Sequence, residues 1–413
     1  MKAVAALLVA VTPALSGLAA AGEPSPFEAA GRALLAAREK FDIVGLSVGA
    51  LHSGRLVWQT NLGYADLDRR VPVTAETRYR IASISKLVTA TAVMQLWERG
   101  RFKLDDPVGA VLGYPVANPH HPDRPVTFRH LLTHRTSFRD GPAYDDFLMY
   151  TYFHPLDAPS FKELLCPGGE YYRDGAVFST NAPGSRYAYS NLGFGLLGTL
   201  VEKISGERFD EYCARHIFRP LGMRASFNPA TLPDPTHLAV LYQATTNGWQ
   251  AQFDDYRGVA PTNRLGPAYK LGHNALPCAP QGGLRANVDD LARFIRIFIQ
   301  PEHGETTGVL KPATVAVMLG RAPADGGEAG PLAFHRTTRL VPGETWIGHT
   351  GSAYGLHSLL FFQENGPMGI VVLTNGSRPG NEQEGFSPME RELVLILRNL
   401  LNSLLEENPS SSR

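Results

Sequence analysis

The sequence has no excess of charge of either sign, because 39 lysines and arginines balance 39 aspartates and glutamates. It also has no long run of like charges. Proteins that bind nucleic acid depend on basic clusters that neutralise the phosphate backbone. We therefore expect no nucleic-acid partner for this chain.

Cysteine is scarce, and the three that are present are Cys166, Cys213 and Cys278. They lack the close pairing of a zinc-binding motif, and a chain of 413 residues can bury a core without disulfide bonds. We interpret them as buried or incidental thiols. One disulfide among them stays an open alternative if the compartment is oxidising.

Histidines cluster once, but without the residues that zinc hydrolases require. His130 and His134 are four apart in a helix predicted from Thr127 to Thr133, a spacing that can bind zinc. No glutamate accompanies them in a His-Glu-x-x-His pattern, so we interpret them as structural and expect no metal or other cofactor. The alternative is a metal hydrolase that also uses His120 and His121, which activity in strong chelator would exclude.

The first residues have the composition of an export signal. Lys2 is followed by an apolar stretch from Ala3 to Leu15 and then by Ala19-Ala20-Ala21. We expect residues 1–21 to be removed and the protein to be periplasmic or secreted. The apolar stretch is short for a membrane anchor, so no stable membrane span is expected in the mature chain.

Strand and helix patterns follow in an order that predicts an α+β fold. A helical pattern at Pro26 to Lys40 precedes a predicted hairpin of Gly45 to His52 and Arg55 to Gly63. Strand patterns return near the other end, at Thr345 to His349, Gly355 to Gln363 and Met368 to Thr374, before a closing helix. These patterns predict one antiparallel sheet built from both termini and flanked by helices, with an inserted, mainly helical lobe.

These patterns predict a single domain of residues 22–405 with two lobes. The sheet lobe covers about 22–82 and 335–405, and the helical lobe covers about 83–334. Residues 406–413 are expected to be a disordered tail.

Ser83-Ile84-Ser85-Lys86 stands where a polar segment gives way to the apolar run from Leu87 to Trp97. A helix that begins at Ile84 places Lys86 one turn from Ser83 on the same side. A lysine in a dry site can take the proton of a serine, and the free N–H groups of a helix start favour an anion there. Ser83 is therefore the predicted nucleophile. For this motif alone, the alternative is a helix cap beside a solvated lysine.

A competing serine motif, Gly45-Leu46-Ser47-Val48-Gly49, matches a nucleophile pattern that requires a strand, a sharp turn and a helix. The residues after Ser47 continue as a hairpin instead. We therefore interpret Ser47 as an ordinary strand residue.

A second chemical signal is Tyr189-Ser190-Asn191, on a loop that enters the helical pattern from Leu192 to Ile204. A tyrosine can pass a proton between nucleophile and leaving group, and an asparagine amide can hold a substrate carbonyl. Taken alone, Asn191 could equally be a helix cap.

The third signal is His349-Thr350-Gly351, in a strand pattern near the C-terminal end. With Ser-x-x-Lys at 83–86 and Tyr189-Ser190-Asn191, in this order, it resembles the superfamily of class C β-lactamases, DD-peptidases and family VIII esterases. The resemblance spans nearly the whole mature chain. It implies a β-lactamase/transpeptidase-like fold.

The resemblance also implies roles for the matched residues. Ser83 is acylated, Lys86 and Tyr189 move protons, and the backbone N–H groups of Ser83 and Ser352 form the oxyanion hole. The residues implied to contact the substrate are Asn191, His349, Thr350, Gly351 and Ser352.

The sequence therefore predicts an exported serine hydrolase that forms an acyl-enzyme on Ser83 with a small ester, an amide or a short peptide. β-Lactamases of this type usually have lysine where His349 stands. A mostly neutral histidine attracts a carboxylate less, which favours neutral esters or amides. The alternatives are a β-lactamase or DD-carboxypeptidase that acts on penicillins or stem peptides, and a non-catalytic ligand-binding relative.

Overall fold

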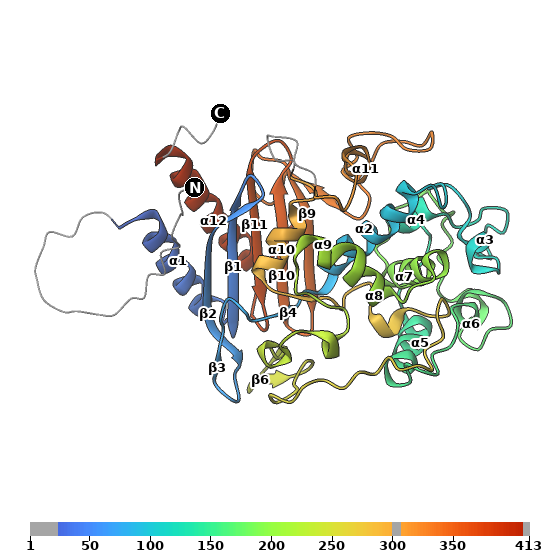
Figure 1. Cartoon of the computed structure of the whole chain (residues 1–413), viewed down its shortest axis with the longest axis horizontal. Helices are drawn as coiled ribbons and strands as arrows, with labels where there is room; N and C mark the ends of the chain where they lie inside the picture. The colour runs from blue at the N-terminus through green and yellow to red at the C-terminus, as the bar shows by residue number, and fades with distance from the viewer. Residues whose placement is uncertain (1–23, 300–306, 408–413) are drawn as a thin grey trace, which may run out of the picture.

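The structure is a computed structural model that describes residues 24–299 and 307–407. It shows one large sheet with helices packed on it and a helical lobe beside it (Figure 1). The sheet has seven antiparallel strands in the order β3–β2–β1–β11–β10–β9–β8. In that order their bounds are Val71–Pro72, Arg55–Asp66, Gly45–His52, Met368–Thr374, Leu356–Gln363, Trp346–Ala353 and His335–Thr337. The predicted signal peptide lies outside the described residues.

The two ends of the chain meet in the middle of this sheet, where β1 pairs with β11 and Val48 lies opposite Val372. β1 and β2 form the predicted hairpin. Its turn residues, Ser53 and Gly54, have φ values of 47° and 71°, as a two-residue hairpin turn requires. The prediction of an antiparallel sheet built from both termini is confirmed.

Both faces of the sheet are covered, which explains why β1 and β11 are buried apolar runs and not alternating patterns. α1 (Pro26–Lys40) and α12 (Pro388–Glu407) pack together on one face. α10 (Val288–Ile295) packs against β1, β2 and β11 on the other. Although α10 lies within residues 83–334, it therefore belongs with the sheet and not with the helical lobe.

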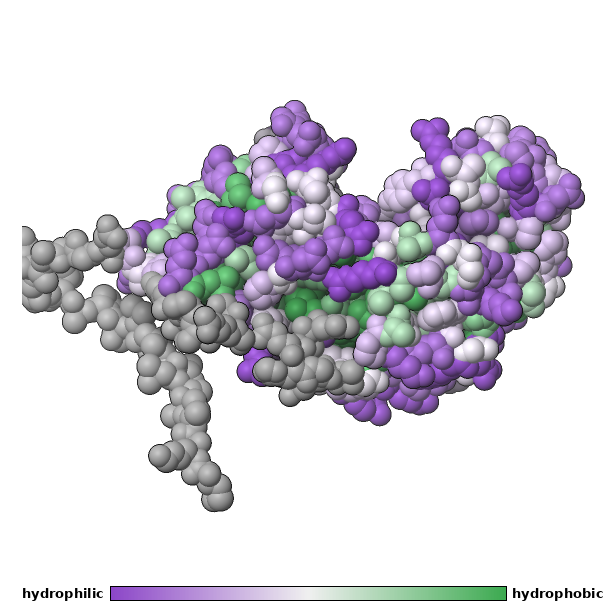
Figure 2. All heavy atoms as spheres, turned by 90° about the horizontal axis from the view of Figure 1, so that it is seen from above, coloured by the Kyte–Doolittle hydropathy of each residue, from purple (hydrophilic) through white to green (hydrophobic). Residues whose placement is uncertain are grey.

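The helical lobe is built around α2 (Ser85–Glu98) and α7 (Asn191–Ser205), which contact each other. Every residue from Ser85 to Leu96 is buried, because α2 lies between the sheet and the rest of the lobe (Figure 1). A helix that is buried on all sides is expected in such a place. Figure 2 shows the surface hollowed where the two lobes meet, with hydrophilic side chains on both rims.

The remaining elements surround this centre. The helices are α3 (Val108–Leu112), α4 (Phe128–Leu132), α5 (Pro142–Phe153), α6 (Lys162–Leu165), α8 (Phe209–Cys213), α9 (Arg219–Leu221) and α11 (Pro312–Met318). Two short antiparallel pairs are β4 (Tyr79–Arg80) with β7 (Arg285–Ala286), and β5 (Tyr242–Thr245) with β6 (Gly248–Ala251). Within residues 24–299 and 307–407, no helix is both long enough and apolar enough to span a membrane.

Two further expectations concern the thiols and the C-terminal end. Cys166, Cys213 and Cys278 are buried and free, which confirms their interpretation as thiols. The closing helix α12 continues to Glu407, past the expected domain end at residue 405.

Candidate active site

Ser83 lies in a 3₁₀ turn, Ala82–Ile84, that leads directly into α2. The α-helix begins at Ser85 and not, as expected, at Ile84. Ser83 therefore lies within the 3₁₀ turn and not directly before the first residue of the α-helix. Ala82 has a φ of 46°, in the left-handed region that residues other than glycine rarely adopt. Strain of this kind is concentrated at functional sites, where the surrounding structure holds it in place.

Lys86 contacts three groups that come from distant parts of the chain. Its Nζ lies 3.0 Å from Ser83 Oγ, 2.8 Å from Asn191 Oδ1 and 2.7 Å from the carbonyl oxygen of Gln281. The side chain is fully buried, which disfavours the ammonium form. Burial lowers the pKa of Lys86 to about 7, although the more distant charge of Asp140 acts in the opposite direction.

A neutral Lys86 amine fits this arrangement. It has two N–H groups for the oxygens of Asn191 and Gln281, and its lone pair is then left for the proton of Ser83. An amine near its pKa at neutral pH is suited to act as a general base.

Tyr189 occupies the other side of the nucleophile. Its hydroxyl donates to Ser83 Oγ at 2.6 Å. Its ring stacks on the imidazole of His134, with 4.5 Å between the ring centres, and lies 4.8 Å from Lys86 Nζ. Burial raises the pKa of Tyr189, so this side chain remains a protonated donor at neutral pH.

Asn191 opens α7 and is held by Asp140. The Asp140 carboxylate accepts hydrogen bonds from the backbone N–H groups of Asn191 and Leu192, from Asn191 Nδ2 and from the hydroxyl of Ser190. A carboxylate at a helix N-terminus satisfies free N–H groups and complements the helix dipole. Asp140 therefore fixes the amide of Asn191 against Lys86.

No sequence signal pointed to Asp140 or to the Gln281 carbonyl group. Asp140 lies 51 positions from Asn191, and Gln281 lies 195 positions from Lys86. No motif spacing relates residues at such separations. A backbone carbonyl group carries no side-chain signature at all.

The third motif lies on β9 beside the Ser83 turn, and Gly351 permits this approach. A Cβ atom on Gly351 would lie 2.3 Å from the carbonyl oxygen of Ile81, so no other residue fits there. Thr350 and Ser352 line an adjoining cavity of about 750 Å³. The structure thus brings Ser352 close to the residues before Ser83, and the predicted oxyanion hole remains compatible with this placement.

His349 is 2% exposed and points into the interior between two rings. It stacks on His335 at 4.8 Å and lies 6.2 Å from the ring of Tyr189. Burial lowers the pKa of His349 well below the usual value for histidine, so the ring is neutral. Its predicted role as a substrate contact stays a prediction.

The other singled-out residues have structural roles. His130 closes the N-terminal cap of α4 with Thr127, and His134 Nδ1 accepts the Ser190 backbone N–H at 3.1 Å, which confirms their structural interpretation. Ser47 sits within β1 and bonds Asn61 and Tyr79, as expected for a strand residue. In the part of the chain that the structure describes, no three or more His, Cys, Asp or Glu residues are grouped to hold a metal ion.

Comparisons with known proteins show the family of the chain. A family model described as Beta-lactamase matches residues 32–387. The human mitochondrial serine beta-lactamase-like protein LACTB is 27% identical over 339 residues, which cover 66% of this chain and 58% of that protein. A beta-lactamase from Pseudomonas fluorescens is 24% identical over 371 residues, which cover 83% of this chain and 91% of that protein.

Solved structures share the fold. D-amino acid amidase from Ochrobactrum anthropi SV3, complexed with L-phenylalanine amide, has a TM-score of 0.66 and 18% identity, and the match covers 92% of this chain and 100% of that one. The octameric penicillin-binding protein homologue from Pyrococcus abyssi has a TM-score of 0.65 and 24% identity, with 92% and 77% covered. The predicted β-lactamase/transpeptidase-like fold is confirmed. Since the family model also covers most of the sequence, the chain belongs to the beta-lactamase family.

Proposed function

We propose that the protein is an exported serine hydrolase that forms an acyl-enzyme on Ser83 with an ester or a peptide-like amide. One observation carries this proposal. The oxygen of Ser83 lies within hydrogen-bond distance of both a buried lysine and a tyrosine hydroxyl, at 3.0 Å from Lys86 Nζ and 2.6 Å from Tyr189 Oη. A nucleophile held between a base and an acid has what acyl transfer requires.

The proposed acylation starts with neutral Lys86. Ser83 Oγ attacks the substrate carbonyl carbon as its proton passes to Lys86 Nζ, and the carbonyl oxygen becomes an oxyanion between the backbone N–H groups of Ser83 and Ser352. The bond to the leaving group then breaks, and Tyr189 gives that group a proton. The proton on Lys86 replaces the one that Tyr189 lost. A water molecule reverses these steps and releases the acid.

Ester and amide substrates are supported by the site and by the relatives. The buried, neutral His349 offers no cation to a carboxylate at the third motif, unlike the lysine usual in β-lactamases of this type. Among the similar structures is an enzyme named D-amino acid amidase. The β-lactamase alternative is supported by the relative from Pseudomonas fluorescens.

Export is proposed from residues 1–21 alone, on the order of Lys2, the apolar stretch and the three alanines. N-terminal sequencing of the protein after expression in a bacterial host tests it. A mature chain that starts at Gly22 is expected, and an intact Met1 in the extracellular or periplasmic fraction would contradict it.

The proposed chemistry is tested by intact-mass measurement after exposure to nitrophenyl esters, D-amino-acid amides and penicillin, in the presence of a strong chelator. We expect a transient mass increase equal to the acyl group, located on Ser83 by peptide mapping. A fast return to the mass of the free protein identifies a substrate, and a slow return identifies an inhibitor. If no compound acylates Ser83, or if the chelator abolishes turnover, the proposal is wrong.

A further inference from the structure

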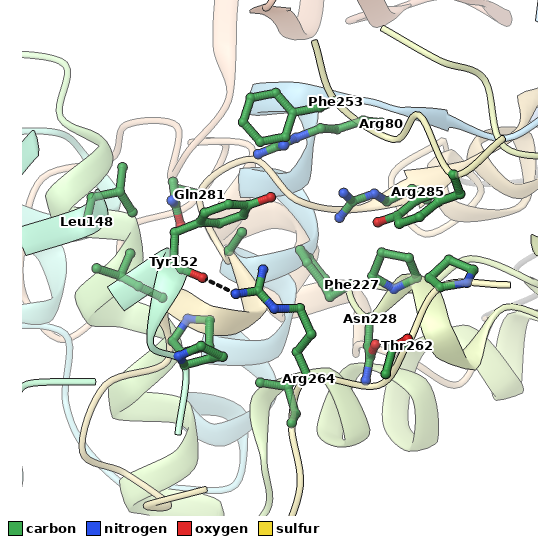
Figure 3. A pocket seen from close by; sticks show the side chains of 18 of the residues that line it. Arg80, Leu148, Tyr152, Phe227, Asn228, Phe253, Thr262, Arg264, Gln281 and Arg285 are labelled. Atoms are coloured by element: carbon green, nitrogen blue, oxygen red, sulfur yellow. Dashed lines mark hydrogen bonds between the residues drawn. The ribbon is translucent and has the colours of Figure 1, made fainter. Parts of the chain in front are cut away.

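A cavity of about 470 Å³ is lined by Arg80, three residues before Ser83, and by Gln281 (Figure 3). Its wall comes from α5 and from segments on both sides of the active-site loop at Gln281. The apolar and aromatic side chains in it include Leu148, Tyr152, Phe227, Phe253, Val259 and Tyr354. A cavity of this size with a largely apolar lining and a few polar groups is typical of a small-molecule site.

The polar part of this lining has one sign of charge. Arg80, Arg264 and Arg285 line the cavity, and no described aspartate or glutamate does. Figure 3 shows the three guanidinium groups around one central space. Asp254 neutralises Arg285 through two hydrogen bonds of 3.0 and 2.7 Å. Arg80 and Arg264 pair with no carboxylate of the described residues, so the cavity keeps an excess of positive charge.

Arg80 is positioned for an anion that the protein itself does not supply. Its Nε donates to the carbonyl oxygen of Gly282 at 3.1 Å, and its guanidinium lies 5.4 Å from the ring centre of Phe253 and 5.2 Å from that of Tyr354. The centres of these two rings are 4.2 Å apart, so both rings lie on the same side of the guanidinium group and do not enclose its edge. Its two terminal nitrogens form no hydrogen bond with the described residues, and this edge matches a carboxylate in a paired geometry.

Arg264 lies on the opposite side of the cavity from Arg80. It donates to the backbone carbonyl group of Tyr152 and stacks on that ring, 4.9 Å from its centre (Figure 3). The side chain is otherwise exposed, so it can adjust to a bound anion. Two arginines on facing walls can bind the anionic end of a ligand. The aromatic rings of the cavity can then contact the apolar part of the ligand.

Gln281 connects this cavity to the catalytic groups. Its backbone carbonyl group accepts from Lys86 Nζ, and its side chain lines the cavity. Gln281 Oε1 is buried and has no hydrogen-bond partner among the described groups, so it offers an acceptor at the junction. A substrate whose carbonyl carbon is at Ser83 would pass Gln281 on its way to Arg80.

The orientation of the substrate in the site follows from Tyr189, which protonates the leaving group in the proposed mechanism. Tyr187, His335 and Thr350 line the cavity of about 750 Å³ on that side of the nucleophile. The leaving group belongs there. The cavity at Gln281 is then left for the acyl group.

We propose that the cavity at Arg80 and Arg264 binds the acyl part of the substrate and selects acyl groups with a carboxylate on an apolar or aromatic body. This inference rests on the proposed function, because it requires acylation of Ser83. It places the cation that binds a substrate carboxylate at the far end of the acyl group, whereas the His349 ring of the third motif is neutral.

The test compares para-nitrophenyl monoesters of glutaric, adipic and pimelic acid with the same compounds methylated at the free carboxyl group. We expect the wild-type protein to have the higher kcat/KM for the carboxylate at one of these lengths. Arg264→Gln should lower the ratio of carboxylate to methyl ester about tenfold, because a hydrogen-bonded charge pair is lost. Arg80→Lys keeps the charge but not the paired geometry, and should lower the ratio as well. The preference should also decrease in high salt.

Arg257→Gln is the matched control. Arg257 lies in the same segment, is 81% exposed at its side chain, pairs with Asp255 and does not line the cavity. This variant should keep the wild-type ratio. A wild-type ratio near one at every length, or a ratio that Arg264→Gln and Arg80→Lys leave unchanged, would overturn the inference while turnover of the methyl esters still supports the acyl-enzyme. Loss of all turnover and of all Ser83 labelling in the wild type would overturn both.

Discussion

Lys86 and Asp140 are held at the two ends of one amide group. Asn191 Oδ1 accepts from Lys86 Nζ at 2.8 Å, and Asn191 Nδ2 donates to Asp140 Oδ2 at 2.9 Å. Asp140 thus orients the amide whose other end receives the amine. It also favours the ammonium form of Lys86, since its charge acts to raise the pKa of that amine.

Asp140→Asn should lower kcat/KM by about 10²-fold, because a displacement of the catalytic groups by about 1 Å can have that effect. Asp146→Asn is the control, since Asp146 lies on α5 with an exposed side chain and pairs with Arg173. A purely structural role would leave the pH profile in place. We expect instead a profile shifted to lower pH, because the negative charge that favours the ammonium form is gone. A lower rate with an unchanged pH midpoint would contradict this role.

The pH dependence of the wild type should follow Lys86. With the pKa of Lys86 lowered to about 7, kcat/KM for a neutral ester should rise as the pH passes through about 7 and then level off. The sign follows from the mechanism, because only the neutral amine can accept the proton of Ser83. Initial rates with a non-titrating ester between pH 5 and 9 measure it. A profile that is flat across pH 7, or that falls, would mean that another group is the base.

Ser83→Ala should abolish both ester hydrolysis and labelling by a fluorophosphonate, whereas Ser47→Ala should retain both. The Ser47 hydroxyl contacts Asn61 at 2.8 Å and Tyr79 at 3.0 Å but no base. Since Ser47→Ala removes one buried and one partly buried hydrogen bond, a loss of about 1 kcal/mol of stability is expected, and rates should be normalised to folded protein. Label that persists on Ser83→Ala would refute the assignment of the nucleophile.

The site was predictable from the sequence where its residues are neighbours along the chain. Ser83 and Lys86 are joined by one helical turn, and Tyr189 and Asn191 lie at one helix start, so their spacing carries the geometry. The amphipathic pattern of α10 likewise predicts a buried face. It does not say whether the sheet or the helical lobe covers that face, and the sheet does. Such long-range contacts arise only when the tertiary structure forms.

Asp140 is the clearest example of this limit. Its carboxylate binds four groups of the Ser190–Leu192 segment, yet it stands in a loop without a motif of its own. Arg80 is a second example, because the place of its unpaired edge beside Phe253 and Tyr354 becomes apparent only in the folded chain.

Removal of Lys86 and Tyr189 should give effects that do not multiply. Each substitution, Lys86→Ala or Tyr189→Phe, should slow acylation by about 10²- to 10⁴-fold, the usual contribution of general acid–base catalysis. Both groups bond the same oxygen, so the double variant should be little slower than the worse single one. Single-turnover acylation rates measure this. Effects that multiply fully would show that the two groups act in separate steps.

The last prediction concerns stability in acid and His134. This residue is 5% exposed, its Nδ1 accepts the Ser190 N–H, and burial lowers its pKa to about 3. The unfolded chain therefore binds a proton at His134 below a pH of about 6.5, whereas the folded chain does not until about pH 3. Stability should fall as the pH decreases through this window, by about 1.4 kcal/mol per pH unit for this one group.

His134→Asn is the variant that isolates this effect. His134 has a φ of 53°, which asparagine tolerates well, and the new amide can still accept the Ser190 N–H. The variant should be less stable at pH 7, because the ring contacts with Tyr189 and Phe194 are lost. Its free energy of unfolding should nevertheless fall less steeply between pH 6 and 4 than that of the wild type. His357, whose pKa burial also lowers, contributes equally to both proteins and cancels in the comparison. Equal slopes would mean that His134 does not titrate between the folded and unfolded states.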